Sequence, residues 1–207
     1  MTTTTTGPTG VTETERSTKS WRTVDVVVAS AIAVAFGVVF WAWGNLWNTT
    51  STAFTAFPPS QAFMYGVWLV PAVLGPLVIR KRGAAIYTEL VASVVSALLG
   101  PSWGLSVIAY GLVQGAAAEL VFAFVLYRSW RLPTALLAGA AAGAAAALLD
   151  LTYYYADWAS DWKLAYTALT TVSALVVAGL GSWLLVRALA QTGVLAPFSS
   201  GRDQARV

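Results

Sequence analysis

Three carboxylates stand inside long apolar stretches of this sequence, and they are the residues best placed to do chemistry. Glu89, Glu119 and Asp150 have no Lys, Arg or His at their depth to act as a counter-charge. A carboxylate buried without a partner is costly in a membrane, so it is protonated, solvated in a water-filled cavity, or joined by a cation. Intramembrane acids are functional candidates for this reason, and we predict that Glu119 and Asp150 face a pocket.

Polar neighbours accompany two of these acids. Gln114 precedes Glu119 on one predicted helix, about 7 Å nearer the outside at 1.5 Å per residue, and adds a neutral donor and acceptor. Ser93 and Ser96, at i+4 and i+7, share the helix face of Glu89.

Structural roles are the alternative for each acid. A satisfied hydrogen bond between helices would serve any of the three, and Glu89 is near enough to the inner boundary to reach Arg80 or Arg82. Asp25 is a different case, because it begins the first apolar stretch beside Arg22. There we expect a helix-end charge stabilised by the helix dipole.

Aromatic residues are frequent, with ten Trp in 207 residues. A belt at the lipid headgroups explains Trp near helix ends, and a stacking pocket open to the outside is the functional alternative. An anionic cavity with an aromatic rim would suit a small, flat, cationic or hydrogen-bonding organic molecule. The Trp residues near predicted outer ends are Trp47, Trp68, Trp103, Trp158 and Trp162.

Catalytic machinery is missing from the sequence. It contains no Cys and no His, which removes thiol nucleophiles, disulfides and most zinc and haem sites. It has no GxxxxGK[ST] phosphate loop, no HExxH and no GxSxG. We therefore predict a protein that is not an enzyme, binds no cofactor or metal, and does not hydrolyse ATP by a phosphate loop.

Composition indicates what positions these residues. The chain is 57% hydrophobic and 10% charged, whereas soluble domains have about 25% charged residues. We predict an all-α integral membrane protein with a bundle of six transmembrane helices. Short segments that contain Gly, Pro or charged residues separate the apolar stretches. These stretches cover about 24–47, 62–79, 84–100, 105–127, 133–154 and 164–189.

The positive charges give this bundle a direction. With six crossings, eleven of the twelve Lys and Arg residues fall on one side, and Lys163 alone falls on the other. The positive-inside rule then predicts that both termini are cytoplasmic. Residues 1–20 are polar and Thr-rich and are predicted to be a disordered tail, residues 21–190 to be the membrane domain, and residues 191–207 to be a second tail.

Small residues form a further pattern in the first apolar stretch. Ala29 and Ala33, and likewise Ala31 and Ala35, are spaced four residues apart. Such faces allow close helix packing inside a bundle, or docking of another membrane protein.

Several short stretches carry a resemblance to a known family, and they extend over almost the whole chain after residue 20. They are Tyr65-Gly66-Val67-Trp68, Ile79-Arg80-Lys81-Arg82-Gly83-Ala84-Ala85, Glu89-Leu90, Gln114-Gly115, Ala118-Glu119, Ala138-Gly139, Asp150-Leu151 and Thr192-Gly193-Val194-Leu195. With the Ala-rich first helix, the chain resembles the substrate-capture S component of energy-coupling factor (ECF) vitamin transporters. Within that group it resembles the YkoE type, assigned to thiamine or its hydroxymethylpyrimidine precursor.

The resemblance implies a division of labour. The S component binds the vitamin near the outer face, with outer loop 48–61 as a gate, while a transmembrane coupling protein and two ATPase subunits supply the energy. The Ala face would meet the coupling protein. Resemblance and burial together suggest that Tyr65, Trp68, Glu89, Gln114, Glu119 and Asp150 bind the ligand, and the aromatic rim adds Trp103.

Two other functions fit the same sequence. One is a stand-alone secondary transporter of a small organic cation, with Glu89 or Glu119 carrying protons. The other is a membrane assembly protein without a small ligand. A scaffold has no reason to bury unpaired acids, whereas a thiamine site would use them as counter-charge for the thiazolium ring.

Overall fold

The computed structural model describes residues 20–204, and all regular elements in that range are helices. The predicted tail at residues 1–20 lies outside the described residues except for Ser20. Along the chain the elements are α2 (Thr23–Thr50), η1 (Ser51–Phe54), η2 (Pro58–Leu69), α3 (Val70–Ile79), α4 (Ala84–Leu98), α5 (Ser106–Phe124), α6 (Leu132–Tyr153), α7 (Ser160–Ala174), η3 (Leu175–Leu180), α8 (Gly181–Gln191) and α9 (Ser199–Gln204).

Five helical stretches in the described range are long and apolar enough to cross a membrane. They are Thr23–Phe54, Pro58–Ile79, Ser106–Phe124, Leu132–Tyr153 and Ser160–Gln191. Helix α4 is also apolar but has 15 residues, which gives about 22 Å at 1.5 Å per residue. It begins after Gly83 at φ 80° and ends before Gly100 at φ 77°, so two left-handed turns limit its length. The prediction of six complete crossings stays a prediction.

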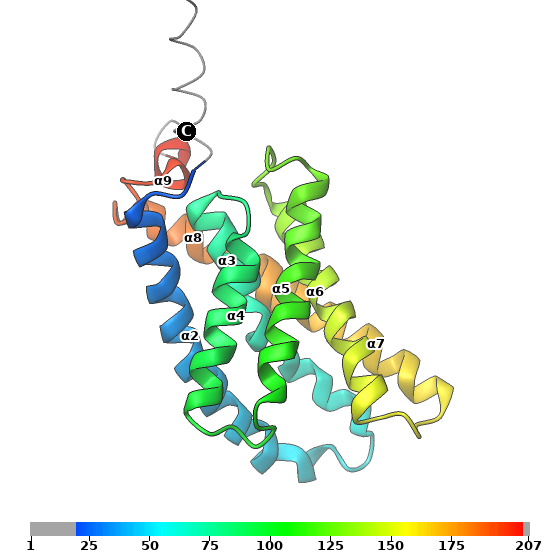
Figure 1. The fold of residues 1–207 in the computed structure, drawn as a ribbon. Coiled ribbons are helices and arrows are strands. Elements are labelled where there is room, and N and C mark those ends of the chain that lie inside the picture. The colour runs from blue at the N-terminus through cyan, green and yellow to red at the C-terminus, as the bar shows by residue number, and fades with distance from the viewer. Residues whose placement is uncertain (1–19, 205–207) are drawn as a thin grey trace, which may run out of the picture.

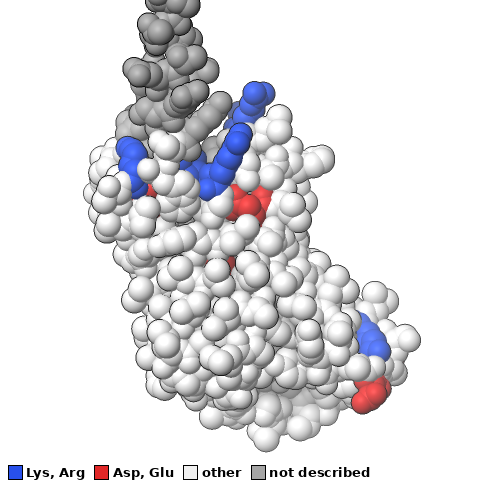
Figure 2. Space-filling view, viewed as in Figure 1, with Lys and Arg blue, Asp and Glu red and all other residues white. Residues whose placement is uncertain are grey.

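The ends of the molecule differ from its middle. Figure 2 shows Lys and Arg side chains gathered at one end, a small charged group at the other, and an almost uncharged surface between them. Exposed apolar side chains such as Val34, Val38 and Leu112 lie on the helices of that middle region. Helix α9 and the start of α2 lie at the same end of the molecule (Figure 1).

Helix α3 is the centre of the bundle. All ten of its residues are buried, and it contacts α2, α4, α5, α6 and α8. The preceding segment, η2, is a 12-residue 3-10 helix, although such helices seldom exceed three or four residues. Ser173 anchors η2, because its hydroxyl donates to Phe63 O at 2.7 Å and accepts from Gly66 N at 3.0 Å.

Helix α2 packs against α4 through one of its two small-residue faces. Ala29 and Ala33 are fully buried, and a Cβ added at Gly37 would lie 2.5 Å from Val95 Cβ. Ala31 and Ala35 are exposed on the other side of the helix. The predicted four-residue docking face therefore needs correction, since Ala29 and Ala33 are covered by the bundle itself.

The charged end is held together by side chains from distant parts of the chain. Arg22 Nη2 lies 2.8 Å from Asp25 Oδ1 in an ion pair, and Lys81 Nζ lies 4.0 Å from Asp25 Oδ2. Trp21 Nε1 donates to Arg82 O at 2.9 Å. Asp25 thus has the helix-end role that its position beside Arg22 predicts.

The region after α8, predicted only as a tail, packs on the C-terminal end of α3. Leu195 and Phe198 are buried, and Ser200 Oγ donates to Val78 O at 2.9 Å. Arg22 lies over the Phe198 ring at 5.9 Å from its centroid.

Replacing Gly37 by Leu should destabilise the bundle, because the new side chain would overlap Val95. Overpacking of this kind costs about 1–3 kcal/mol. Thermal unfolding of the purified protein in detergent measures the effect as a lower midpoint. Ala35→Leu is the matched control, since its position is exposed on the same helix; an equal fall in both variants would contradict the packing described here.

Candidate functional site

A cavity of about 360 Å³ lies among the ends of the helices that are remote from α9. Its size is within the range of about 300–1,000 Å³ that is typical of small-molecule sites. It is lined by residues of α2, η2, α4, α5, α6, α7 and two connections. They are Phe40, Trp47, Tyr65, Trp68, Ser93, Ser96, Pro101, Trp103, Ser106, Val107, Tyr110, Gln114, Asp150, Tyr154, Tyr155 and Tyr166.

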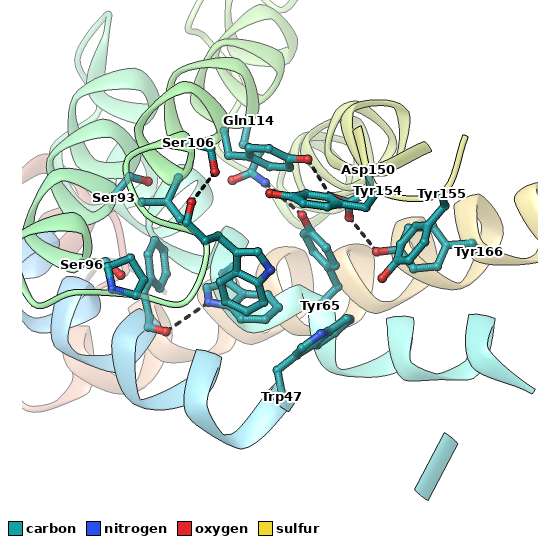
Figure 3. Close-up of a pocket in the computed structure, with 16 residues that line it drawn as sticks. Trp47, Tyr65, Ser93, Ser96, Ser106, Gln114, Asp150, Tyr154, Tyr155 and Tyr166 are labelled. Atoms are coloured by element: carbon teal, nitrogen blue, oxygen red, sulfur yellow. Dashed lines mark hydrogen bonds between the residues drawn. The ribbon is translucent and has the colours of Figure 1, made fainter. Parts of the chain in front are cut away.

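One end of the cavity is built around Asp150. The Tyr110 hydroxyl donates to Asp150 Oδ1 at 2.8 Å, and the Tyr166 hydroxyl donates to Oδ2 at 2.6 Å (Figure 3). The Tyr65 hydroxyl also interacts with this carboxylate. Donors from three different helical segments therefore converge on one acid, which is 5% exposed.

Small residues in α6 bring Tyr166 to Asp150. A Cβ at Gly143 would lie 2.6 Å from Ala174 Cβ, and one at Gly139 would lie 2.6 Å from Ala174 O. Helices α6 and α7 can therefore approach closely. The Gly and Ala residues of α6 have a structural use, because they set the spacing at which a tyrosine of α7 reaches the last turn of α6.

Tyr155 extends the aromatic wall beside Asp150. Its ring stacks on Trp158 with centroids 4.0 Å apart and contacts the edge of Tyr166 at 5.0 Å. Burial, followed by the negative charge of Asp150, raises the pKa of Tyr155 to about 12. The hydroxyl stays neutral at physiological pH, so this wall adds π surface and no second negative charge.

The other end of the cavity is neutral. Trp68 and Trp103 meet at nearly a right angle with centroids 5.6 Å apart, and Trp68 Nε1 donates to Phe40 O at 3.3 Å. Ser93 and Ser96 of α4 line the same region. Figure 3 shows these two serines on the opposite side of the cavity from Asp150 and Tyr166.

Tyr65 and Gln114 lie between the two ends. Gln114 Nε2 donates to the Tyr65 hydroxyl at 3.5 Å, and the Tyr65 ring contacts both Trp47 and Trp68, with centroids 6.0 and 5.3 Å away. The cavity is thus continuous from an acidic, tyrosine-rich end to a neutral end with tryptophans and serines.

Five of the seven predicted ligand residues line this cavity. Glu119 does not. Its carboxylate accepts hydrogen bonds from Gly83 N at 2.6 Å, Ala85 N at 2.9 Å and the Tyr127 hydroxyl at 2.8 Å. It therefore caps the N-terminus of α4 at the charged end of the molecule. The five predicted ligand residues that do line the cavity are Tyr65, Trp68, Trp103, Gln114 and Asp150.

Glu89 also lies outside the cavity lining. It is fully buried, and its Oε2 accepts a hydrogen bond from Ala72 N at 2.8 Å. The adjacent Thr88 hydroxyl donates to Pro71 O at 2.7 Å. Two consecutive residues of α4 thus hold both polar atoms of the single peptide group between Pro71 and Ala72 at the start of α3. The structural alternative for Glu89 was a contact with Arg80 or Arg82, and the partner found is this backbone group.

Tyr110 and Tyr166 are the main cavity residues that sequence reasoning missed. Tyr110 is four residues before Gln114 on α5, so helical spacing could have placed both side chains on one face. Tyr166 reaches Asp150 across a loop from the next helix, and no local spacing indicates that contact. Ser93 and Ser96 line the cavity, whereas Glu89, which precedes them on the same face of α4, does not.

Known proteins resemble this chain over most of its length. A family model described as "ABC-type cobalt transport system, permease component" matches residues 24–145. The Bacillus subtilis (strain 168) protein named "Putative HMP/thiamine permease protein YkoE" is 33% identical over 186 residues, which cover 89% of this chain and 92% of that protein. A solved structure described as "Crystal structure of an S-component of ECF transporter" aligns with a TM-score of 0.86 and 32% identity, covering 90% of this chain and 94% of that one.

Replacing Glu119 by Ala should lower stability, because Gly83 N, Ala85 N and the Tyr127 hydroxyl lose their shared acceptor. Unsatisfied buried donors cost about 1–3 kcal/mol. Thermal unfolding in detergent is the measurement. Glu119→Gln keeps one acceptor oxygen and should lose less; an alanine variant as stable as the parent protein would contradict the capping role.

Proposed function

Because the chain belongs to the S components of ECF transporters, and within them to the YkoE type, we propose that it binds thiamine or its hydroxymethylpyrimidine precursor in the membrane for import. Transport components of this kind capture a substrate and are not enzymes. The observation that carries the proposal is the cavity at one end of the bundle, where an acid, five tyrosines and three tryptophans meet. Hydroxymethylpyrimidine and thiamine are both flat molecules that such rings can stack on.

The donor set favours an organic ligand over a metal ion. The sequence has no His and no Cys, and Asp150 is the only acid among the described residues that line the cavity. Cobalt and other first-row metals are usually held by several imidazole, thiolate or carboxylate ligands. One carboxylate that already accepts hydrogen bonds from tyrosines fits an organic cation better.

Import would require partners that supply energy. The proposal includes a transmembrane coupling protein and two ATPase subunits, since the sequence contains no phosphate loop. Of the four alanines predicted to dock a partner, Ala31 and Ala35 are exposed on α2 and could contact the coupling protein. Small side chains allow the backbones of two membrane helices to approach closely.

The purified chain alone, without ATP, should bind thiamine or hydroxymethylpyrimidine with a dissociation constant of about 1 μM or below, since a preformed cavity needs no energy input. Isothermal titration calorimetry in detergent measures both ligands, with Co²⁺ as a third titrant. Asp150→Ala should abolish thiamine binding. Asp161→Ala is the matched control, because Asp161 is exposed at the start of α7 and lies outside the cavity lining.

Tight Co²⁺ binding with no response to either organic compound would reject the proposed ligand. Loss of thiamine binding in both aspartate variants would show that removing a negative charge anywhere at this end abolishes binding, so that Asp150 has no specific role. Thiamine binding that is unchanged in Asp150→Ala would remove Asp150 from the proposed site. Absence of binding to all three titrants would favour the membrane assembly protein without a small ligand.

Ala31→Leu combined with Ala35→Leu should weaken ATP-dependent uptake while ligand binding stays intact. The larger side chains would hold the partner helix away from α2. Uptake is measured in proteoliposomes that contain the chain with its coupling protein and ATPases. Ala168→Leu, at an exposed alanine of α7, is the control. Full uptake driven by a pH gradient without ATPases would instead support the secondary transporter.

A further inference from the structure

The two ends of the cavity offer a ligand different chemistry. Asp150 and the tyrosines around it form the acidic end, and Ser93, Ser96, Trp68 and Trp103 form the neutral end. Figure 3 shows the labelled members of the two groups well separated, with Tyr65 between them. A ligand with two unlike parts could satisfy both ends at once.

The acidic end has charge to offer but few open acceptor positions. Both oxygens of Asp150 already accept hydrogen bonds, from the hydroxyls of Tyr110 and Tyr166. The Tyr65 hydroxyl also interacts with this carboxylate. Three tyrosine hydroxyls therefore leave a ligand amine about one of the four acceptor positions of the carboxylate. A permanent aromatic cation without N–H groups needs only the negative potential and π faces, and Tyr154 and Tyr155 supply those faces at this end.

The neutral end has the opposite character. Among the described residues, the hydroxyls of Ser93 and Ser96 have no protein hydrogen-bond partner, although both residues are 3% exposed and line the cavity. Their hydroxyls can donate to or accept from a ligand. The Trp68 and Trp103 rings border the same space at a right angle and add flat apolar surface. A neutral heteroaromatic ring with nitrogen acceptors and an amino group matches this end.

We propose that the cavity recognises its ligand in two parts, with a permanent, donor-free cation at Asp150 and a neutral hydrogen-bonding ring at Ser93 and Ser96. This inference rests on the proposed function and makes it more specific. For thiamine, the thiazolium ring lies at the acidic end and the aminopyrimidine ring at the serine end. Hydroxymethylpyrimidine fills the serine end alone, so it binds more weakly than thiamine and responds little to changes at Asp150.

Three titrants separate these contributions on the full-length protein. They are thiamine, hydroxymethylpyrimidine and 3-deazathiamine, in which a neutral ring replaces the thiazolium. The unmodified chain should bind thiamine at least about tenfold more tightly than 3-deazathiamine, because the latter lacks the charge that Asp150 attracts. This comparison needs no variant to fold. Equal affinities for the two compounds would overturn the inference while leaving thiamine binding established.

Two sets of variants locate each ring. Asp150→Asn should weaken thiamine by about tenfold or more and hydroxymethylpyrimidine by less than about threefold. Ser93→Ala with Ser96→Ala should weaken hydroxymethylpyrimidine and thiamine by similar factors, and should keep the preference for thiamine over 3-deazathiamine.

The reverse pattern would overturn the assignment of the ends. A serine double variant that loses the preference for the cation would place the thiazolium on α4. An Asp150→Asn variant that loses both ligands equally would place the pyrimidine at the acid. Failure of the unmodified chain to bind any of the three compounds would instead remove the proposed function, together with the inference built on it.

Discussion

The rest of this structure depends on satisfying polar groups inside a medium that has no water to offer. Within a bilayer, each buried backbone N–H or carboxylate must find its partner in the protein. Two of the buried acids find partners at helix starts, where unpaired N–H groups are available. Among the described residues, Oε1 of Glu89 still has no hydrogen-bond partner. Glu119 accepts from Gly83 N and Ala85 N at the start of α4, and Glu89 accepts from Ala72 N in the first turn of α3.

The hydrogen bonds of Glu119 and Glu89 determine where α4 lies and which of its side chains reach the cavity. Glu119 fixes its first turn, and Thr88 and Glu89 hold it against the start of α3, where Gly75 leaves space for the Thr88 side chain. One and two turns further along, the same face of α4 carries Ser93 and Ser96 into the cavity. The acids that stay out of the cavity therefore serve it, because they set the position of the helix that forms its neutral wall.

Sequence reasoning could find the bundle but could not sort its acids. Apolar stretches, the charge distribution and the Asp25–Arg22 pair are local patterns, and the structure has helices in each predicted stretch. Apart from the Tyr127 hydroxyl at Glu119, the partners of Glu89 and Glu119 are backbone N–H groups at the starts of other helices. Every residue except Pro has such a group, so no side-chain pattern reveals these contacts. The Tyr166–Asp150 contact likewise depends on how closely α6 and α7 pack. The counter-charge argument therefore stays a prediction for Asp150, which lines the cavity, while Glu89 and Glu119 have partners outside the cavity.

Asp150 differs from Glu89 and Glu119 in the kind of partner that it has. Hydroxyl donors from Tyr110 and Tyr166 satisfy its oxygens without cancelling its negative charge. An Arg or Lys in the same place would neutralise the site, and a cationic ligand would then have to displace it at the cost of leaving a buried charge unpaired. Tyrosines avoid that exchange and remain as aromatic walls when a ligand enters. A cavity that must bind a cation tightly and later release it gains from holding its charge by neutral donors, which keep the carboxylate in position whether or not a ligand is present.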